Sequence, residues 1–274
     1  MKRLFQSLAA WPLPLLHAVG AVLGWLAFLA SPTYRRRFLA NAAQAGYAWR
    51  EVRSAVAEAG KLLGEVPRLW FGYTPPVRWE GEERILAARA LGRGVVCLTP
   101  HLGCFEVTAQ AFGARFGHIT VLYRPARKAW LRELVDTARN RPNLSAAPAT
   151  LPGVRQMLKA LRAGEAIGLL PDQVPPHGLG VWAPFFGSPA YTMTLAGRLA
   201  QQTGAPLLLF WGERLPRGQG YCIHVRDWVG EQPVDPAAAA RQLNENMEAL
   251  VRECPGQYLW GYARYKQPRE AGAA

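Results

Sequence analysis

Short apolar runs of strand length alternate with helical patterns from residue 83 onward, and this alternation constrains the fold more than any other feature of the chain. Strands that read as continuous apolar runs are covered by helices on both faces, so the pattern predicts an α/β fold with a central sheet flanked by helices. Two late runs are joined by a turn containing Pro and Gly, which predicts that part of the sheet is antiparallel, giving a mixed sheet. The expected strands are Gly94–Leu98, Ile119–Tyr123, Ala166–Leu170, Leu207–Trp211 and Tyr221–Val225, and the expected helices are Glu83–Leu91, Phe105–Phe116, Ala129–Arg139, Pro152–Leu161, Met193–Thr203 and Ala237–Arg252.

The N-terminal segment Leu4–Tyr34 contains no Lys, Arg, Asp or Glu. It is long enough to cross the roughly 30 Å hydrocarbon core of a bilayer. Basic residues both precede and follow it, so the charge pattern leaves its orientation undecided. We expect residues 1–34 to be a retained membrane anchor that either spans the bilayer or lies in its interface. A buried helix of the globular domain is the alternative.

Residues 35–76 form a second section, with a helical pattern over Phe38–Val66 in which apolar and charged residues are interspersed. This amphipathic region predicts either an ordinary helix packed on the domain or a second membrane contact, assisted by the arginines that begin at Arg35. Pro67 and then Gly72–Pro76 mark the end of the section, and we place the following domain at residues 77–270.

The chain is strongly basic, with a formal net charge of +13, which predicts an anionic partner. No helix-turn-helix, zinc-finger or RNP-like pattern is present, so we expect no nucleic-acid partner. Ten tryptophans and the apolar N-terminal segment favour an anionic membrane surface. An acidic carrier protein fits the same excess of positive charge.

The four cysteines, Cys97, Cys104, Cys222 and Cys254, form no CxxC pair and no Cys/His array with the spacing of metal ligands. We therefore expect reduced thiols and no metal site. Cys104 lies near a histidine at a predicted helix start, which also fits a nucleophilic thiol. Nothing else in the sequence is typical of a thiol hydrolase, so this alternative is the weaker one.

One histidine and one glutamate stand at the junction between the predicted strand Gly94–Leu98 and the predicted helix Phe105–Phe116. The junction brings both to the carboxyl end of a strand, where open α/β sheets bind ligands. His101 is the candidate general base, and Glu106 is the carboxylate expected to fix its tautomer. Backbone N–H groups after His101, at the start of the following helix, are candidates for stabilising an oxyanion, with Gly103 allowing that backbone to come close. A capping histidine and a first-turn glutamate that complements the helix dipole are the simpler interpretation.

Three later segments and the C-terminal sequence follow this junction in a recognisable order. They are Leu122-Tyr123-Arg124-Pro125, Leu170-Pro171-Asp172-Gln173, Pro184–Thr192 and Tyr262–Lys266. With this order and spacing, the chain closely resembles the lipid A biosynthesis lauroyl/myristoyl (late) acyltransferase family, within the lysophospholipid acyltransferases that share the signature His-x4-Asp/Glu. That family usually has Asn-Trp before the glutamate, where this chain has Cys104-Phe105.

The resemblance implies a membrane-associated O-acyltransferase with a glycerolipid acyltransferase-like fold, whose catalytic domain is residues 77–270. It implies direct transfer of a fatty acyl chain from an acyl carrier protein or acyl-CoA thioester to a hydroxyl of a lipid A precursor, with no acyl-enzyme and no cofactor. It also implies location at the bacterial inner membrane, with the catalytic domain facing the cytoplasm. The alternatives are another lysolipid or glycolipid acceptor, and a basic membrane-surface module without catalysis.

The remaining candidate site residues follow other predicted strands. Arg124, next to Tyr123 at the end of a strand, suits a phosphate on the acceptor or on the phosphopantetheine arm of a carrier, and Arg139 is a second phosphate candidate. Asp172 and Gln173 end another strand, where Asp172 is expected to order the site or to orient Arg124. A solvated arginine and a turn-capping aspartate are the simpler interpretations.

Overall fold

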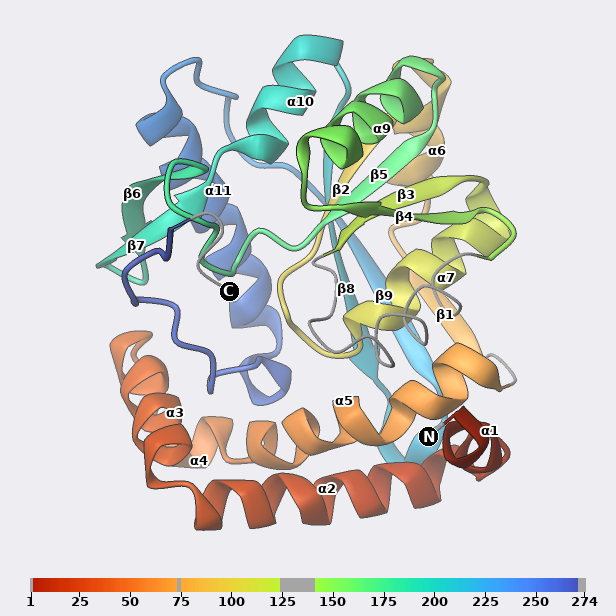
Figure 1. The fold of residues 1–274 in the computed structure, drawn as a ribbon, viewed down its shortest axis with the longest axis vertical. Coiled ribbons are helices and arrows are strands. Elements are labelled where there is room, and N and C mark those ends of the chain that lie inside the picture. The colour runs from red at the N-terminus through yellow and green to blue at the C-terminus, as the bar shows by residue number, and fades with distance from the viewer. Residues whose placement is uncertain (1, 73–74, 124–140, 271–274) are drawn as a thin grey trace.

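A mixed seven-stranded sheet with helices on both faces forms the centre of the protein, as Figure 1 shows. The computed structural model describes residues 2–72, 75–123 and 141–270. In the strand order β1-β9-β8-β2-β5-β3-β4, all neighbours pair in parallel except β8 and β9, which are antiparallel. The predicted α/β fold with a mixed sheet is therefore confirmed. The strands are β1 Val77–Glu80, β2 Val95–Leu98, β3 Ile119–Tyr123, β4 Leu144–Pro148, β5 Ala166–Leu169, β8 Leu207–Arg214 and β9 Tyr221–Asp227.

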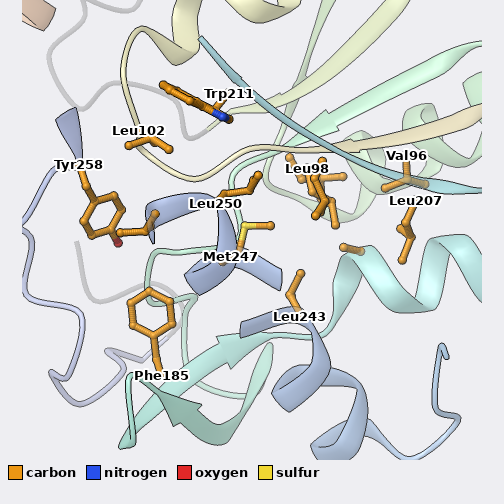
Figure 2. Close-up of a cluster of buried hydrophobic side chains, with 14 of the residues drawn as sticks. Val96, Leu98, Leu102, Phe185, Leu207, Trp211, Leu243, Met247, Leu250 and Tyr258 are labelled. Carbon is orange, nitrogen blue, oxygen red and sulfur yellow. The ribbon is translucent and has the colours of Figure 1, made fainter. Parts of the chain in front are cut away.

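Helices cover the two faces of this sheet with separate buried clusters. Strands β2 and β5, in the middle of the sheet, are buried at every position, which is why they read as unbroken apolar runs. On one face, α6 and α7 pack over a cluster that includes Phe112 and Phe210. On the other face, α9, α10 and α11 pack over a larger cluster, and Figure 2 shows Met247 and Leu250 of α11 within it. These helices are α6 Glu83–Ala90, α7 Phe105–Phe116, α9 Leu151–Arg162, α10 Leu195–Thr203 and α11 Pro236–Glu253.

A two-stranded hairpin, β6 Gly180–Phe185 and β7 Ser188–Met193, lies outside the main sheet. Its two-residue turn is Phe186–Gly187, and both residues have positive φ, 46° and 76°. Two positive φ angles are the geometry of the hairpin turn that matches the twist of its strands. The predicted helix that began at Met193 instead begins at Leu195, because Met193 completes β7.

The N-terminal residues form helices that lie along one end of the molecule (Figure 1). The helical pattern over Phe38–Val66 is divided among α3, α4 and α5, and the chain turns between α3 and α4 at Gly46, which has the left-handed φ of 86°. The predicted helix Ala129–Arg139 lies outside the described residues. The N-terminal helices are α1 Lys2–Ala9, α2 Leu13–Ala30, α3 Pro32–Gln44, α4 Trp49–Val52 and α5 Ser54–Phe71.

Helices α2 and α5 run side by side and pack through glycines. Gly20 and Gly24 of α2 face Gly60 of α5 so closely that a Cβ added at Gly20 would lie 2.6 Å from the carbonyl oxygen of Gly60. A Cβ at Gly60 would clash in turn with the carbonyl oxygen of Gly20. Small residues four apart allow helix backbones to approach in this way.

The opposite side of α2 carries an exposed apolar stripe, which we call the apolar face of α2. Within the described residues, α2 is the one helix long and apolar enough to cross a membrane by length and composition, and 33% of it is buried. Gly20 and Gly24 on its buried side face α5, whereas Val22 and Leu29 are 59% and 63% exposed. The spacing of alternately four and three residues places the whole stripe on one side of the helix. It consists of Leu15, Val19, Val22, Leu26 and Leu29.

The glycine contact makes a stability prediction with an internal control. Gly60→Ala is expected to lower the free energy of unfolding by about 1–3 kcal/mol, because the added methyl overpacks the α2–α5 contact. Gly197→Ala in α10, where an added Cβ meets only a side-chain methyl at 4.0 Å, is expected to raise it by about 0.5–1 kcal/mol through helix propensity. Thermal or denaturant unfolding in detergent measures both. Equal effects of the two substitutions would contradict the close helix contact.

Candidate active site

The loop between β2 and α7 is held by β8 and by the C-terminal segment. The N–H of Gly103 donates to the carbonyl of Gln257 (3.0 Å), and the N–H of Cys104 donates to the carbonyl of Gly212 (2.7 Å). Gly103 has φ 58°, and a Cβ there would clash with the Gly212 carbonyl oxygen, so this position needs glycine. Both of these N–H groups are engaged by carbonyls, so the expected oxyanion role stays a prediction for the N–H groups at the start of the following helix.

His101 is oriented by Asp172, which follows the neighbouring strand β5. Its Nδ1 lies 2.7 Å from Asp172 Oδ1, and its backbone N–H donates to Asp172 Oδ2 (2.9 Å). Asp172 is almost fully buried and also accepts a hydrogen bond from the Tyr258 hydroxyl (3.2 Å). Burial alone would raise the pKa of the Asp172 carboxyl, but the charge and hydrogen bonds of His101 outweigh it and lower that pKa.

The contact with Asp172 determines which imidazole nitrogen carries the lone pair. With Nδ1–H donated to the carboxylate, Nε2 of His101 is an acceptor, and the amide of Gln173 lies 2.9 Å from it. The ring also packs edge-on against Phe105, with ring centroids 4.7 Å apart. The arrangement presents Nε2 as a base to any hydroxyl that takes the place of the Gln173 amide.

We expected Glu106 to be the carboxylate that fixes the tautomer of His101. The structure gives this position to Asp172, whose carboxylate lies against Nδ1 of His101. Glu106 lies in the first turn of α7 and accepts a hydrogen bond from the indole N–H of Trp70 (3.3 Å). Its side chain lines the same cavity as His101. Catalytic participation of Glu106 thus stays a prediction, in a different role.

A large, mainly apolar cavity of about 670 Å³ opens beside His101. Residues of both buried clusters line it: Cys97 and Val121 belong to the α6–α7 face of the sheet, whereas Leu169 and Leu199 belong to the opposite face. The cavity therefore extends around the carboxyl edge of the strands onto both faces of the sheet. Volume and lining of this kind suit a long apolar ligand.

The other predicted site residues have mixed outcomes. Tyr123 and Gln173 line the cavity, and their predicted role in substrate binding stays a prediction. Arg124 and Arg139 lie outside the described residues, so their predicted phosphate contacts stay predictions. Gly103 contacts β8 rather than forming part of the cavity wall that the described residues provide.

A buried ion pair supports the loop from behind. Arg214 of β8 donates to both carboxylate oxygens of Glu65 on α5 (2.7–3.0 Å) and to the carbonyl oxygen of Gly103 (2.8 Å). Glu65 also accepts from the Tyr221 hydroxyl (2.9 Å) and lies 3.1 Å from Nε2 of His17 on α2. Burial alone would raise the pKa of Glu65, but Arg214 and His17 outweigh it and lower that pKa to about 2.

Sequence reasoning missed these supporting residues because their partners are distant along the chain. Arg214 and Glu65 are 149 residues apart, and Tyr258 and Asp172 are 86 apart. One feature of the sequence could have indicated a buried cation at this place. Glu58 and Glu65 are seven residues apart in a helical pattern and so share one helix face, and both contact Arg214.

A second group of polar side chains lies at the sheet edge. Within the described residues, Glu80, Cys222 and His224 lie close enough to hold a metal ion. Carboxylates of Glu80 (3.1 Å) and Glu213 (3.0 Å) already engage the two nitrogens of His224, and Arg226 pairs with Glu80 (2.8 Å). The guanidinium beside the carboxylate disfavours a cation there, so we interpret the group as an ion-pair network.

Comparison with known proteins gives one consistent result. A family model described as bacterial lipid A biosynthesis acyltransferase matches residues 4–267. The chain is 30% identical over 213 residues to the lipid A biosynthesis lauroyltransferase of Escherichia coli (strain K12), covering 76% of this chain and 69% of that protein. It is 29% identical over 212 residues to the palmitoleoyltransferase of the same organism, covering 76% and 68%. A lipid A biosynthesis acyltransferase of Haemophilus influenzae is 25% identical over 279 residues, covering 96% and 88%.

The buried ion pair predicts a distinctive acid sensitivity. Glu65→Gln is expected to lower the free energy of unfolding at neutral pH by about 3–5 kcal/mol, because Arg214 is left buried without its counter-charge. The pKa of Glu65, about 2 in the folded protein against an ordinary 4.5, means that its stabilisation is present above pH 4.5 and is lost as pH falls toward 2.

Over that pH range, the free energy of unfolding should therefore fall more steeply for the wild type than for Glu65→Gln. Denaturant titrations in detergent between pH 2 and 7 measure both slopes. Glu231→Gln, at an exposed position, is the matched control and should follow the wild type. Parallel curves for all three proteins would show that Glu65 does not carry the buried charge.

Proposed function

This chain belongs to the bacterial lipid A biosynthesis acyltransferase family, and from that membership we propose that it transfers a fatty acyl chain from the thioester of an acyl carrier protein to a hydroxyl of a lipid A precursor. Acyl transfer to lipid A is supported by the family as a whole. Family membership does not specify the acyl donor, the proton transfers or the membrane contact, and these three are our proposals. The observation that carries the proposal is the Asp172–His101 pair at the wall of a large apolar cavity.

In the proposed mechanism, His101 acts as the general base. Its Nε2 takes the proton of the acceptor hydroxyl as the oxygen attacks the thioester carbonyl carbon, and Asp172 stabilises the imidazolium that forms. The tetrahedral intermediate collapses with cleavage of the C–S bond, and the imidazolium returns its proton to the leaving thiolate. The acyl group passes directly to the acceptor, so no acyl-enzyme forms.

Two further groups complete this mechanism. We propose that backbone N–H groups in the first turn of α7 donate hydrogen bonds to the developing oxyanion, because the N–H groups of a first helical turn have no partner within the helix. Glu106 in the same turn is assigned to positioning the acceptor hydroxyl, because Glu106 and His101 line the same cavity. Arg124 and Arg139 remain the proposed contacts for phosphate on the acceptor or on the donor arm.

The membrane contact is assigned to the apolar face of α2. This helix lies along α5 rather than projecting from the molecule, and its apolar face points away from α5. We therefore propose an interfacial contact, with the apolar face of α2 in the lipid and the arginines at Arg35–Arg37 near lipid phosphates. The proposed location is the bacterial inner membrane, with the catalytic site on the cytoplasmic side.

The catalytic assignment predicts a specific pattern of rate losses. His101→Ala and Asp172→Asn should each reduce the transfer rate by at least about 100-fold, and the double variant should be no worse than His101→Ala, because the two residues act as a unit. Glu106→Gln should also lower the rate. Mass spectrometry of the acylated acceptor measures transfer, and His177→Ala at an exposed position is the control. Transfer at the wild-type rate by His101→Ala would exclude the mechanism.

The membrane assignment predicts loss of salt-resistant binding in a Leu26→Glu/Leu29→Glu variant, because two charges would enter the lipid from the apolar face of α2. A matched control is Val234→Glu, an apolar residue that is 87% exposed and lies before α11. Membrane fractionation at low and high salt separates the proteins. If the double variant and the control partition alike at high salt, α2 is not the membrane contact.

A further inference from the structure

Helix α9 presents a row of cations that no described side chain neutralises. Arg155, Lys159 and Arg162 lie at spacings of four and three residues, are all exposed, and form what we call the basic face of α9. The salt bridges of the described residues involve none of the three. Neither α9 nor its neighbour α10 contains Asp or Glu. Positive potential therefore accumulates over this part of the surface.

The basic face begins at the mouth of the cavity. Leu151, the first residue of α9, lines the cavity and is nevertheless 65% exposed, so it lies at the opening. Arg155 is one turn further along the same side of the helix. Val154 of α9 and Arg198 of α10 also line the cavity. A macromolecule bound along α9 would thus be held beside the entrance that leads to His101.

The position of α9 argues against a lipid surface as its partner. Figure 1 shows α9 and α10 at the end of the molecule away from α2 and α5. With the apolar face of α2 in a membrane, α9 and its basic face lie at the end of the molecule away from that membrane (Figure 1), in the aqueous phase. Its partner is therefore a soluble acidic molecule rather than an anionic bilayer.

We propose that the basic face of α9 is the docking surface for an acidic carrier protein, which delivers the acyl thioester through the opening at Leu151. This inference rests on the proposed function and assigns the two substrates to opposite ends of the molecule. The acidic carrier binds at α9, and the lipid acceptor arrives from the side of α2. Charge pairs at the rim of such an interface accelerate encounter and make it sensitive to ionic strength.

The test compares two donors that carry the same acyl chain. One is the acyl thioester of an acidic acyl carrier protein, and the other is the uncharged acyl-pantetheine, which has the same reactive group without the protein. In the variant Arg155→Glu/Lys159→Glu/Arg162→Glu, KM for the carrier-bound donor should rise at least about tenfold, because favourable charge contacts become repulsive ones. Its kcat, and both constants for acyl-pantetheine, should stay within about twofold of the wild type.

Arg241→Glu, at an exposed position on α11, makes the same kind of charge change away from the cavity and should leave both donors unaffected. Equal KM changes for both donors would overturn the proposal, because they would indicate a distorted cavity. An unchanged KM for the carrier-bound donor would overturn it as well. Loss of binding to anionic vesicles without an effect on the carrier-bound donor would assign the basic face to a membrane instead.

Direct binding separates this inference from the proposed function. Calorimetric titration of the wild type and the triple variant with carrier protein lacking an acyl chain does not depend on turnover. Binding by the wild type and its loss in the variant would support the docking surface even if neither donor were used. Equal binding by both proteins would overturn the docking surface and leave the proposed function standing.

Discussion

The buried ion pair between Arg214 and Glu65 is the interaction on which the catalytic end of this protein depends. Two charges removed from water are stable only when each finds a well-placed partner, so α5 and β8 must meet in one geometry. The same guanidinium holds the carbonyl oxygen of Gly103, and the same carboxylate contacts His17 of α2. The N-terminal helices are therefore connected to the loop that carries His101. The segment boundaries predicted at residues 34 and 76 stay predictions. Side chains of all three predicted segments nevertheless contact one another, as His17, Glu65 and Arg214 do.

The site itself is a product of strand order. Strand β2 delivers His101 and its neighbour β5 delivers Asp172, so pairing of the two strands brings a base and a carboxylate together from positions 71 residues apart. The sequence pattern His-x4-Glu points instead to Glu106, which is separated from the histidine by four residues. Glu106 lines the cavity, but the carboxylate that lies against Nδ1 of His101 is that of Asp172, which the pairing of β2 with β5 brings there.

Much of the fold follows from local signals, and the exceptions have physical causes. Strands buried on both faces, such as β2 and β5, were predictable because burial demands continuous apolar residues. Strand β1 alternates exposed and half-buried positions at the sheet edge, and β4, β6 and β7 contain Pro. Such segments lack a strong strand pattern. Of the site, His101, Asp172 and Gln173 were identified from the sequence. Tyr258 and Arg214 were not, because only tertiary contacts bring them near the loop.

The cavity around the strand edge is continuous with the hydrophobic core on both faces of the sheet. Apolar side chains from both faces of the sheet line it, and in a closely packed interior such a volume lacks the contacts that neighbouring atoms would provide. An acyl chain that enters it completes the packing of the protein as well as presenting a reactive carbonyl. Under the proposed function the acyl donor would thus be a ligand of the folded state, and an amphiphile that binds in the cavity would raise the fraction of folded protein with its concentration. On the same proposal, detergents and free fatty acids that fit the cavity would compete with the acyl donor and at the same time stabilise the folded protein.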